Sequence, residues 1–104
     1  MFVVHNRITV PAEHASTFEQ MFTDSFKHLA SFPGLTRTTL QRPRQPDQPY
    51  VSTMEWESAE AFQDWMKSGS FRASHALPEG APRDAMGSSS VIETFETISD
   101  LRYS

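Results

Sequence analysis

The stretch FVVHNRITVP, residues 2–11, decides the fold of this chain. Apolar side chains at positions 2, 4, 8 and 10 alternate with polar side chains at 5, 7 and 9, the period of a half-buried β-strand, and Pro11 ends the pattern. Asn6 falls in the apolar row. A buried amide must find a hydrogen-bond partner or cost roughly 1–3 kcal/mol. Asn6 is therefore either a structural amide bonded to loop backbone or water, or a polar group that faces a pocket.

Two helices are predicted after this strand, because the hydrophobic period changes to helical spacing. The first runs from about His14 to Ser31, and Pro33-Gly34 ends it. Ser58 stands at the N-cap of the second helix, and Gly69 ends it. A short helical continuation, capped by Ser70, is predicted to carry residues 71–75.

Three further strands complete the prediction. Leu35–Gln41 and Tyr50–Trp56 alternate like strands, and a loop with three prolines connects them. The last strand is predicted from about Val91 to Ile98, after a loop from Leu77 to Ser90. The order βαββαβ is that of the α+β ferredoxin-like fold, in which helices cover one face of an antiparallel sheet. The other face is uncovered, so we expect a homodimer in which a second copy covers it.

Length and composition exclude several classes of function. A chain of 104 residues is expected to form a single domain over residues 1–104. The net charge of −4, with scattered basic residues, argues against a nucleic-acid partner. The absence of cysteine excludes disulfides and thiolate sites and fits the cytoplasm. No apolar run reaches membrane-spanning length and no signal-peptide pattern opens the chain, so we expect a cytoplasmic protein without a membrane segment.

Two further residues could carry chemistry together with Asn6. Trp65 lies one helical turn from Phe62, which is the spacing of core residues, although an indole can also flank a flat ligand. His75 is far in sequence from the other histidines, which rules against a zinc or di-iron site built from several histidines. A lone histidine is more often a surface or hydrogen-bonded group. Haem iron, however, needs only one protein ligand, because the porphyrin supplies four nitrogens.

Three segments together resemble the Isd-type haem-degrading monooxygenases of the antibiotic-biosynthesis-monooxygenase (ABM) superfamily. They are Asn6 on the first strand, the run WESAEAFQDW at residues 56–65, and FRASH at residues 71–75. The similarity extends from Val3 to about Ile98. Members that bind no haem share the motif at residues 56–65, so the trio of Asn6, Trp65 and His75 is what narrows the resemblance to the haem-degrading type.

The resemblance implies a dimeric α+β barrel with a haem pocket in each subunit between sheet and helices. His75 matches the axial iron ligand, and Asn6 matches the distal amide that hydrogen-bonds bound dioxygen. Trp65 matches the indole that buckles the porphyrin, and Phe22 matches an aromatic residue of the pocket wall. Haem would be both cofactor and substrate, and a reductase or small-molecule reductant would be the external electron donor for cleavage and iron release.

Two alternatives remain open from the sequence. The first is a cofactor-independent monooxygenase of polycyclic phenols or quinols, in which Asn6 and Trp65 hold the substrate and His75 has no part. The second is a non-catalytic dimeric module that binds haem. Hydrolases and nucleotide-binding enzymes are disfavoured, because the chain has neither a G-x-S-x-G elbow nor a glycine-rich phosphate loop.

Overall fold

The structure is a computed structural model, and it describes residues 1–69, 71 and 89–103. The described elements follow the predicted order of strands and helices. They are β1 (Phe2–Thr9), α1 (Ala15–Ser25), β2 (Leu35–Gln41), β3 (Tyr50–Trp56), α2 (Ala59–Met66) and β4 (Ser89–Glu96). Short 3-10 turns, Ala12–His14 and Phe26–His28, flank α1 on its two sides.

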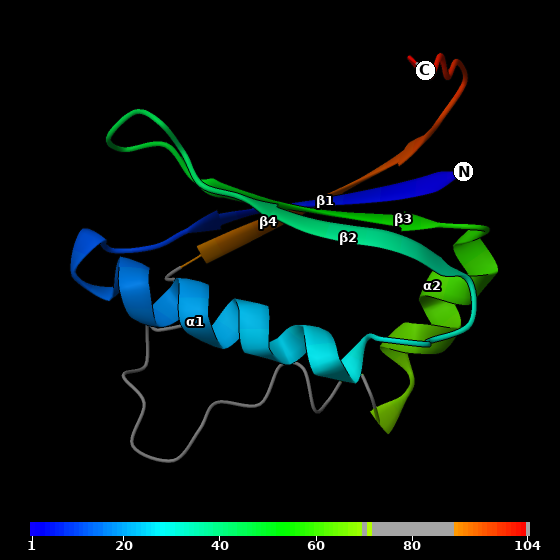
Figure 1. Cartoon of the computed structure of the whole chain (residues 1–104), viewed down its shortest axis with the longest axis horizontal. Helices are drawn as coiled ribbons and strands as arrows, with labels where there is room; N and C mark the ends of the chain where they lie inside the picture. The colour runs from blue at the N-terminus through cyan, green and yellow to red at the C-terminus, as the bar shows by residue number, and fades with distance from the viewer. Residues whose placement is uncertain (70, 72–88, 104) are drawn as a thin grey trace.

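The described strands form one antiparallel sheet in the order β2-β3-β1-β4. Both helices lie on the same side of this sheet, with α1 running beneath its length and α2 near one end (Figure 1). The expected α+β ferredoxin-like fold is therefore confirmed. Strand β1 is central, because it pairs with β3 on one side and with β4 on the other.

The first helix ends earlier than its hydrophobic pattern predicted. The α-helix stops at Ser25 and a 3-10 turn follows, whereas the apolar spacing predicted a helix to Ser31. The Ser25 hydroxyl donates to the Phe22 carbonyl at 2.6 Å, a local bond that competes with helical hydrogen bonding. Ser31 itself has φ +74, which no right-handed helix allows.

The last strand lies earlier in the sequence than predicted. Its described part begins at Ser89 rather than Val91, and Ser89 and Ser90 pair with Thr9 and Ile8 of β1. It ends at Glu96 rather than Ile98, and Glu96 is the register partner of Phe2, the first residue of β1. One residue further on, the Thr97 N–H still donates to the Met1 carbonyl at 2.9 Å.

The second helix begins as predicted. Ser58 is extended at the N-cap, and its hydroxyl oxygen accepts the Ala61 N–H at 3.1 Å. The helix ends at Met66, three residues before the predicted stop at Gly69. The Ser68 hydroxyl oxygen accepts the Phe71 N–H at 3.1 Å, which is a capping interaction. The sequence had predicted the cap at Ser70, a residue that lies outside the described residues.

The core between sheet and helices is largely aromatic. Trp56 and Phe18 are fully buried, each at the centre of one cluster of apolar side chains. The centroid of the Trp56 ring lies 5.7 Å from that of Trp65 and 5.8 Å from that of Phe62, so tilted ring pairs join β3 to α2. Such aromatic pairs contribute about 0.5–1.5 kcal/mol each beyond the burial of their area.

Gly34 joins the first helical segment to β2 at a point where no side chain fits. Its φ is +88, and a Cβ added there would lie 2.5 Å from the Ala61 Cβ. Its carbonyl accepts the Glu57 N–H at 2.8 Å, just before α2 begins. The glycine therefore permits the close approach of α2 to the start of β2.

Replacing Gly34 by alanine is expected to destabilise the fold by roughly 2–4 kcal/mol, the sum of left-handed strain and a clash with Ala61. Gly69→Ala is the matched control, because nothing lies within 4 Å of a Cβ at that position and its φ is not positive. Thermal and urea unfolding of the two variants would measure the difference. Equal stability of both would show that the Gly34 contact carries no energy.

Candidate functional site

A pocket of about 290 Å³ lies between the sheet and the helices. This volume is near the lower end of the roughly 300–1,000 Å³ common for ligand sites. Its described lining is mainly apolar, and the residues come from all four strands, both helices and the segments that follow the helices. They are Val4, Asn6, Ile8, Phe22, Ser25, Leu29, Thr38, Ser52, Met54, Phe62, Trp65, Met66, Phe71, Ser90 and Ile92.

Strand alternation places Asn6 on the helix-facing side of the sheet. Val4 and Ile8, two residues before and after it, are both buried in the core. In the register of the sheet, Asn6 pairs with Ser52 on β3 and with Ile92 on β4. The Asn6 Oδ1 atom is enclosed and has no hydrogen-bond partner among the residues that the structure describes. The pocket therefore has one amide in a wall that is otherwise mostly apolar.

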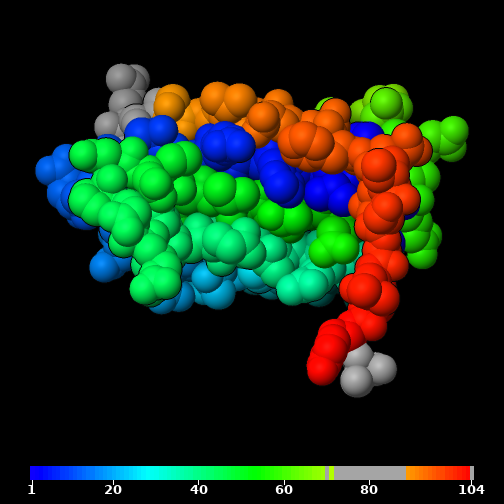
Figure 2. Space-filling view, turned by 90° about the horizontal axis from the view of Figure 1, so that it is seen from above, coloured from blue at the N-terminus to red at the C-terminus, as the bar shows by residue number. Residues whose placement is uncertain are grey.

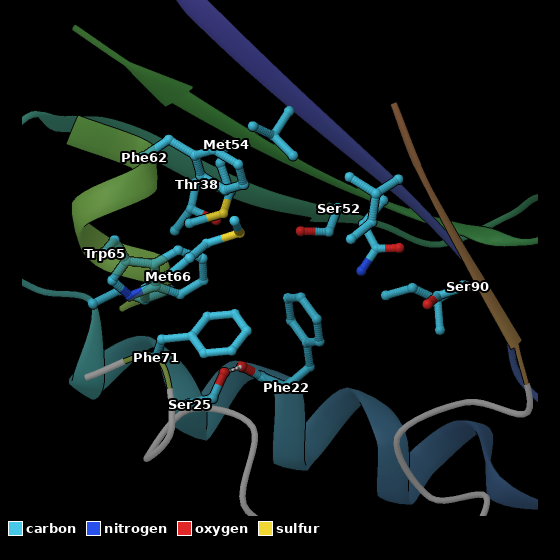
Figure 3. A pocket seen from close by; sticks show the side chains of 15 residues that line it. Phe22, Ser25, Thr38, Ser52, Met54, Phe62, Trp65, Met66, Phe71 and Ser90 are labelled. Atoms are coloured by element: carbon cyan, nitrogen blue, oxygen red, sulfur yellow. Dashed lines mark hydrogen bonds between the residues drawn. The ribbon is translucent and has the colours of Figure 1, made fainter. Parts of the chain in front are cut away.

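Flat aromatic rings form the opposite side of the pocket. Trp65 is only 4% exposed, and its ring meets that of Phe71 edge-on at 4.9 Å and 83°. From α1, the Phe22 ring packs at 5.4 Å against Phe18 and at 5.8 Å against Phe26. Figure 3 shows Phe22 and Phe71 rising from the helix side toward the sheet, with Trp65 beside them. These rings can contact both the edge and the face of a planar ligand.

Three of the four predicted site residues meet at this pocket. Asn6, Trp65 and Phe22 all line it, although they are separated by many residues in sequence. His75 lies outside the described residues, so its predicted role stays a prediction. Ser52 was not among the predicted site residues, although it lies opposite Asn6 on the helix-facing side of the sheet. Its position in the alternation of Tyr50–Trp56 was the available signal.

The described pocket lining contains no charged side chain. The strongest charge cluster instead joins α1 to the sheet. The Arg42 guanidinium donates to both Glu19 carboxylate oxygens, at 2.8 and 2.5 Å, and the Tyr50 hydroxyl donates to Glu19 Oε2 at 2.5 Å. Because Tyr50 also packs on Phe18 at 4.8 Å, this cluster fixes the helix that carries Phe22.

Hydrogen bonds from Arg42 and Tyr50 lower the pKa of Glu19 from 4.5 to about 2. Burial and the bond to Glu19 raise the pKa of Tyr50. A carboxyl whose pKa is depressed by folding stabilises the folded state above its unfolded pKa, and this stabilisation is lost as pH falls toward the folded pKa. The Glu19 contribution is thus present at neutral pH and disappears between about pH 4.5 and about 2.

Glu19→Gln is therefore expected to lower the melting temperature at neutral pH and to lose less stability than the wild type between pH 4.5 and 2. Glu57→Gln is the control, because Glu57 is exposed and its side chain has no ion pair within the described residues. Thermal unfolding of the wild type and of both variants across this pH range would measure how the stability of each depends on pH. Parallel pH profiles for wild type and Glu19→Gln would contradict a stabilising role of the cluster.

Among the described residues, no group of three or more histidine, cysteine, aspartate or glutamate side chains could hold a metal ion. No described helix is long and apolar enough to cross a membrane.

Comparison with known proteins defines the class. Residues 1–77 match the model of the antibiotic biosynthesis monooxygenase family. The chain belongs to this family. It is 32% identical over 77 residues to a staphylobilin-producing heme oxygenase of Staphylococcus epidermidis, covering 72% of this chain and 73% of that protein. It is 30% identical over 96 residues to a mycobilin-producing heme oxygenase of Mycobacterium tuberculosis, covering 92% of this chain and 88% of that protein.

Solved structures agree with this placement. A mutant of MhuD, a heme-degrader from Mycobacterium tuberculosis, was crystallised with two manganese protoporphyrin IX molecules per active site. It matches 99% of this chain and 100% of its own, with a TM-score of 0.85 and 30% identity. A mutant of SnoaB, a cofactor-independent oxygenase from Streptomyces nogalater, matches 98% of this chain and 97% of its own, with a TM-score of 0.75 and 27% identity.

Proposed function

We propose that this protein is a haem-degrading monooxygenase that binds haem in the pocket and oxidatively cleaves the porphyrin with release of iron. The observation that carries the proposal is the enclosed Asn6 amide, without a partner among the described residues, in a pocket walled by aromatic rings. The relatives named as heme oxygenases and the heme-degrader structure support the same activity. Their products differ, so the proposal does not extend to the site of cleavage.

The described residues fit a flat, apolar macrocycle. Phe22, Trp65 and Phe71 offer ring surfaces, and Met54 and Leu29 add apolar contacts. Asn6 offers the polar contact, since a side-chain amide can present its NH₂ as a donor. The exposed fractions of Met66 and Ile92, 43% and 60%, place them at the rim, so that the charged propionates of haem would extend past them into water.

Haem, when bound, supplies the redox-active iron and is also the molecule that is cleaved. His75 would hold the iron through a neutral imidazole nitrogen. Asn6 would present its NH₂ to the bound ligand as a hydrogen-bond donor. The Trp65 ring packs against those of Phe62 and Phe71, and it would contact the macrocycle and distort it. The apolar lining excludes water.

Electrons must come from outside the chain, from a reductase or a small-molecule reductant. Because the chain has no cysteine, it has neither a dithiol nor a thiolate-bound iron–sulfur cluster of its own for this purpose.

We propose that the reaction takes place in the cytoplasm and that residues 1–104 form a single ABM-type domain. Cell fractionation with an epitope-tagged chain would test the location.

The first functional prediction is that hemin added to the protein gives a shifted Soret band, which bleaches with iron release when ascorbate is added. A stable band would favour a haem-binding module, and no band would favour a cofactor-independent monooxygenase of phenols or quinols.

His75→Ala is expected to abolish stable haem binding or to leave a spectrally altered complex. His28→Ala is the control. An unchanged spectrum and affinity in His75→Ala would rule out the axial role of His75.

The second functional prediction separates binding from turnover. Asn6→Ala and Trp65→Phe are expected to bind haem within about threefold of the wild type but to degrade it at least about tenfold more slowly, because each removes an effect of roughly 1.4 kcal/mol on the reaction alone. Single-turnover absorbance measurements with ascorbate would report both quantities. If both folded variants turn over haem at the wild-type rate, neither residue acts in the reaction.

We also propose that the protein is a homodimer joined through the outer face of the sheet. Figure 2 shows this face, with the strands side by side and the C-terminal segment crossing one end. Val91 and Phe95 of β4 are 58% and 45% exposed, and Phe95 lies 5.0 Å from His5 at the centre of the sheet. The ion pair of Arg7 and Glu93, at 2.7 Å, gives the face a polar patch beside this apolar area.

Sedimentation at micromolar concentration is expected to give the mass of a dimer, and Phe95→Glu is expected to give a monomer, because it places a charge in the apolar area. Glu96→Gln, one residue further along β4, is the control. A wild-type monomer that still degrades haem would exclude dimerisation as a requirement for activity.

A further inference from the structure

Two polar side chains on the sheet side of the pocket lie opposite each other on neighbouring strands. Asn6 of β1 is the register partner of Ser52 of β3, and both line the pocket. Residues directly opposite in an antiparallel pair have Cα atoms roughly 4.5–5.5 Å apart and side chains on the same face. Rotation about the Ser52 side-chain bond can therefore bring its hydroxyl to the Asn6 amide.

The Asn6 amide oxygen is enclosed and needs a partner. It has no hydrogen bond within the described ranges, although nearly all buried polar atoms in folded proteins are hydrogen-bonded. Ser52 is only 4% exposed, is the buried polar residue of the described core and lines the same pocket. Its hydroxyl is a donor that can satisfy a carbonyl acceptor on the adjacent strand.

Other hydroxyls of the pocket are placed less well for this task. Thr38 is on β2, which is separated from β1 by β3. Ser90 is opposite Ile8 rather than Asn6, and Ser25 already donates to the Phe22 carbonyl. Figure 3 shows Ser52 on the sheet side of the pocket, between Thr38 and Ser90. Ser52 is therefore the hydroxyl that the sheet register assigns to Asn6.

We propose that Ser52 is a positioning residue, whose hydroxyl donates a hydrogen bond to Asn6 Oδ1 and thereby holds the Asn6 NH₂ toward the ligand. An unrestrained amide can turn over and exchange its donor for its acceptor. When Asn6 Oδ1 is held in a hydrogen bond, the Asn6 NH₂ is the group that faces the pocket. The consequence for haem turnover rests on the proposed function, whereas the hydrogen bond itself does not.

The bond is tested in the protein without haem by a double-mutant cycle of Ser52→Val and Asn6→Ala in urea unfolding. The two substitutions are expected to be coupled by about fivefold in the folding equilibrium constant, the size of one net hydrogen bond. Thr38→Val with Asn6→Ala is the matched control, and it is expected to be additive. Additive effects of Ser52→Val and Asn6→Ala would overturn the proposal.

The positioning role is tested in the haem complex. Ser52→Val is expected to slow single-turnover degradation about tenfold, with haem affinity within about threefold, and Ser52→Thr is expected to restore the rate because it keeps the hydroxyl. In the Asn6→Ala background, Ser52→Val is expected to add nothing. A further loss in that background, or equal losses in Ser52→Thr and Ser52→Val, would mean that Ser52 acts through packing and would overturn the positioning role.

A third measurement needs no variant and no haem. A crystal structure of the wild-type protein at a resolution that orients the amide is expected to place Ser52 Oγ within about 3.2 Å of Asn6 Oδ1. A hydroxyl bonded elsewhere, with Asn6 Oδ1 facing the pocket, would refute the proposal. If the bond is present but no haem is degraded, the proposed function fails and the structural inference stands.

Discussion

The pairing of β1 with β3 on one side and β4 on the other is the constraint on which the rest of the molecule depends. It fixes which side chains face the helices and which face the outer surface. A shift of one residue would move Asn6 to the outer face and bring His5 into the core. Because β1 pairs with both of its neighbours, the sheet wall of the pocket and the outer face both follow from this one strand.

The helices are held against that sheet by two different kinds of interaction. At one end, Gly34 lets Ala61 of α2 approach closely, and rings around Trp56 fill the space between them. Toward the other end, the Glu19 carboxylate binds Arg42 and Tyr50 and fixes α1. The pocket lies between these attachments. Its aromatic wall therefore belongs to the packed core, which makes it suited to resist, rather than follow, the shape of a ligand.

Strand and helix order, the N-cap at Ser58 and the fold class could be predicted from sequence, because each rests on local periodicity and capping. Helix and strand ends could not. The end of α1 depends on a hydroxyl that competes for a main-chain carbonyl, and β4 pairs with a strand far away in sequence. Asn6, Trp65 and Phe22 were found from an amide out of place and a family resemblance, and the pocket brings them together. Ser52 was missed, because a serine in a strand is unremarkable until the register shows that Asn6 is its neighbour.

We propose that haem binds between the sheet row containing Asn6 and the aromatic wall of Trp65 and Phe22. A crystal structure of the haem complex would test this binding site. We expect a bent ring in contact with Trp65, with His75 on the iron at one face and the Asn6 NH₂ directed at the other. Haem on the outer face of the sheet, or an iron ligand other than His75 with Asn6 remote from the ring, would contradict it.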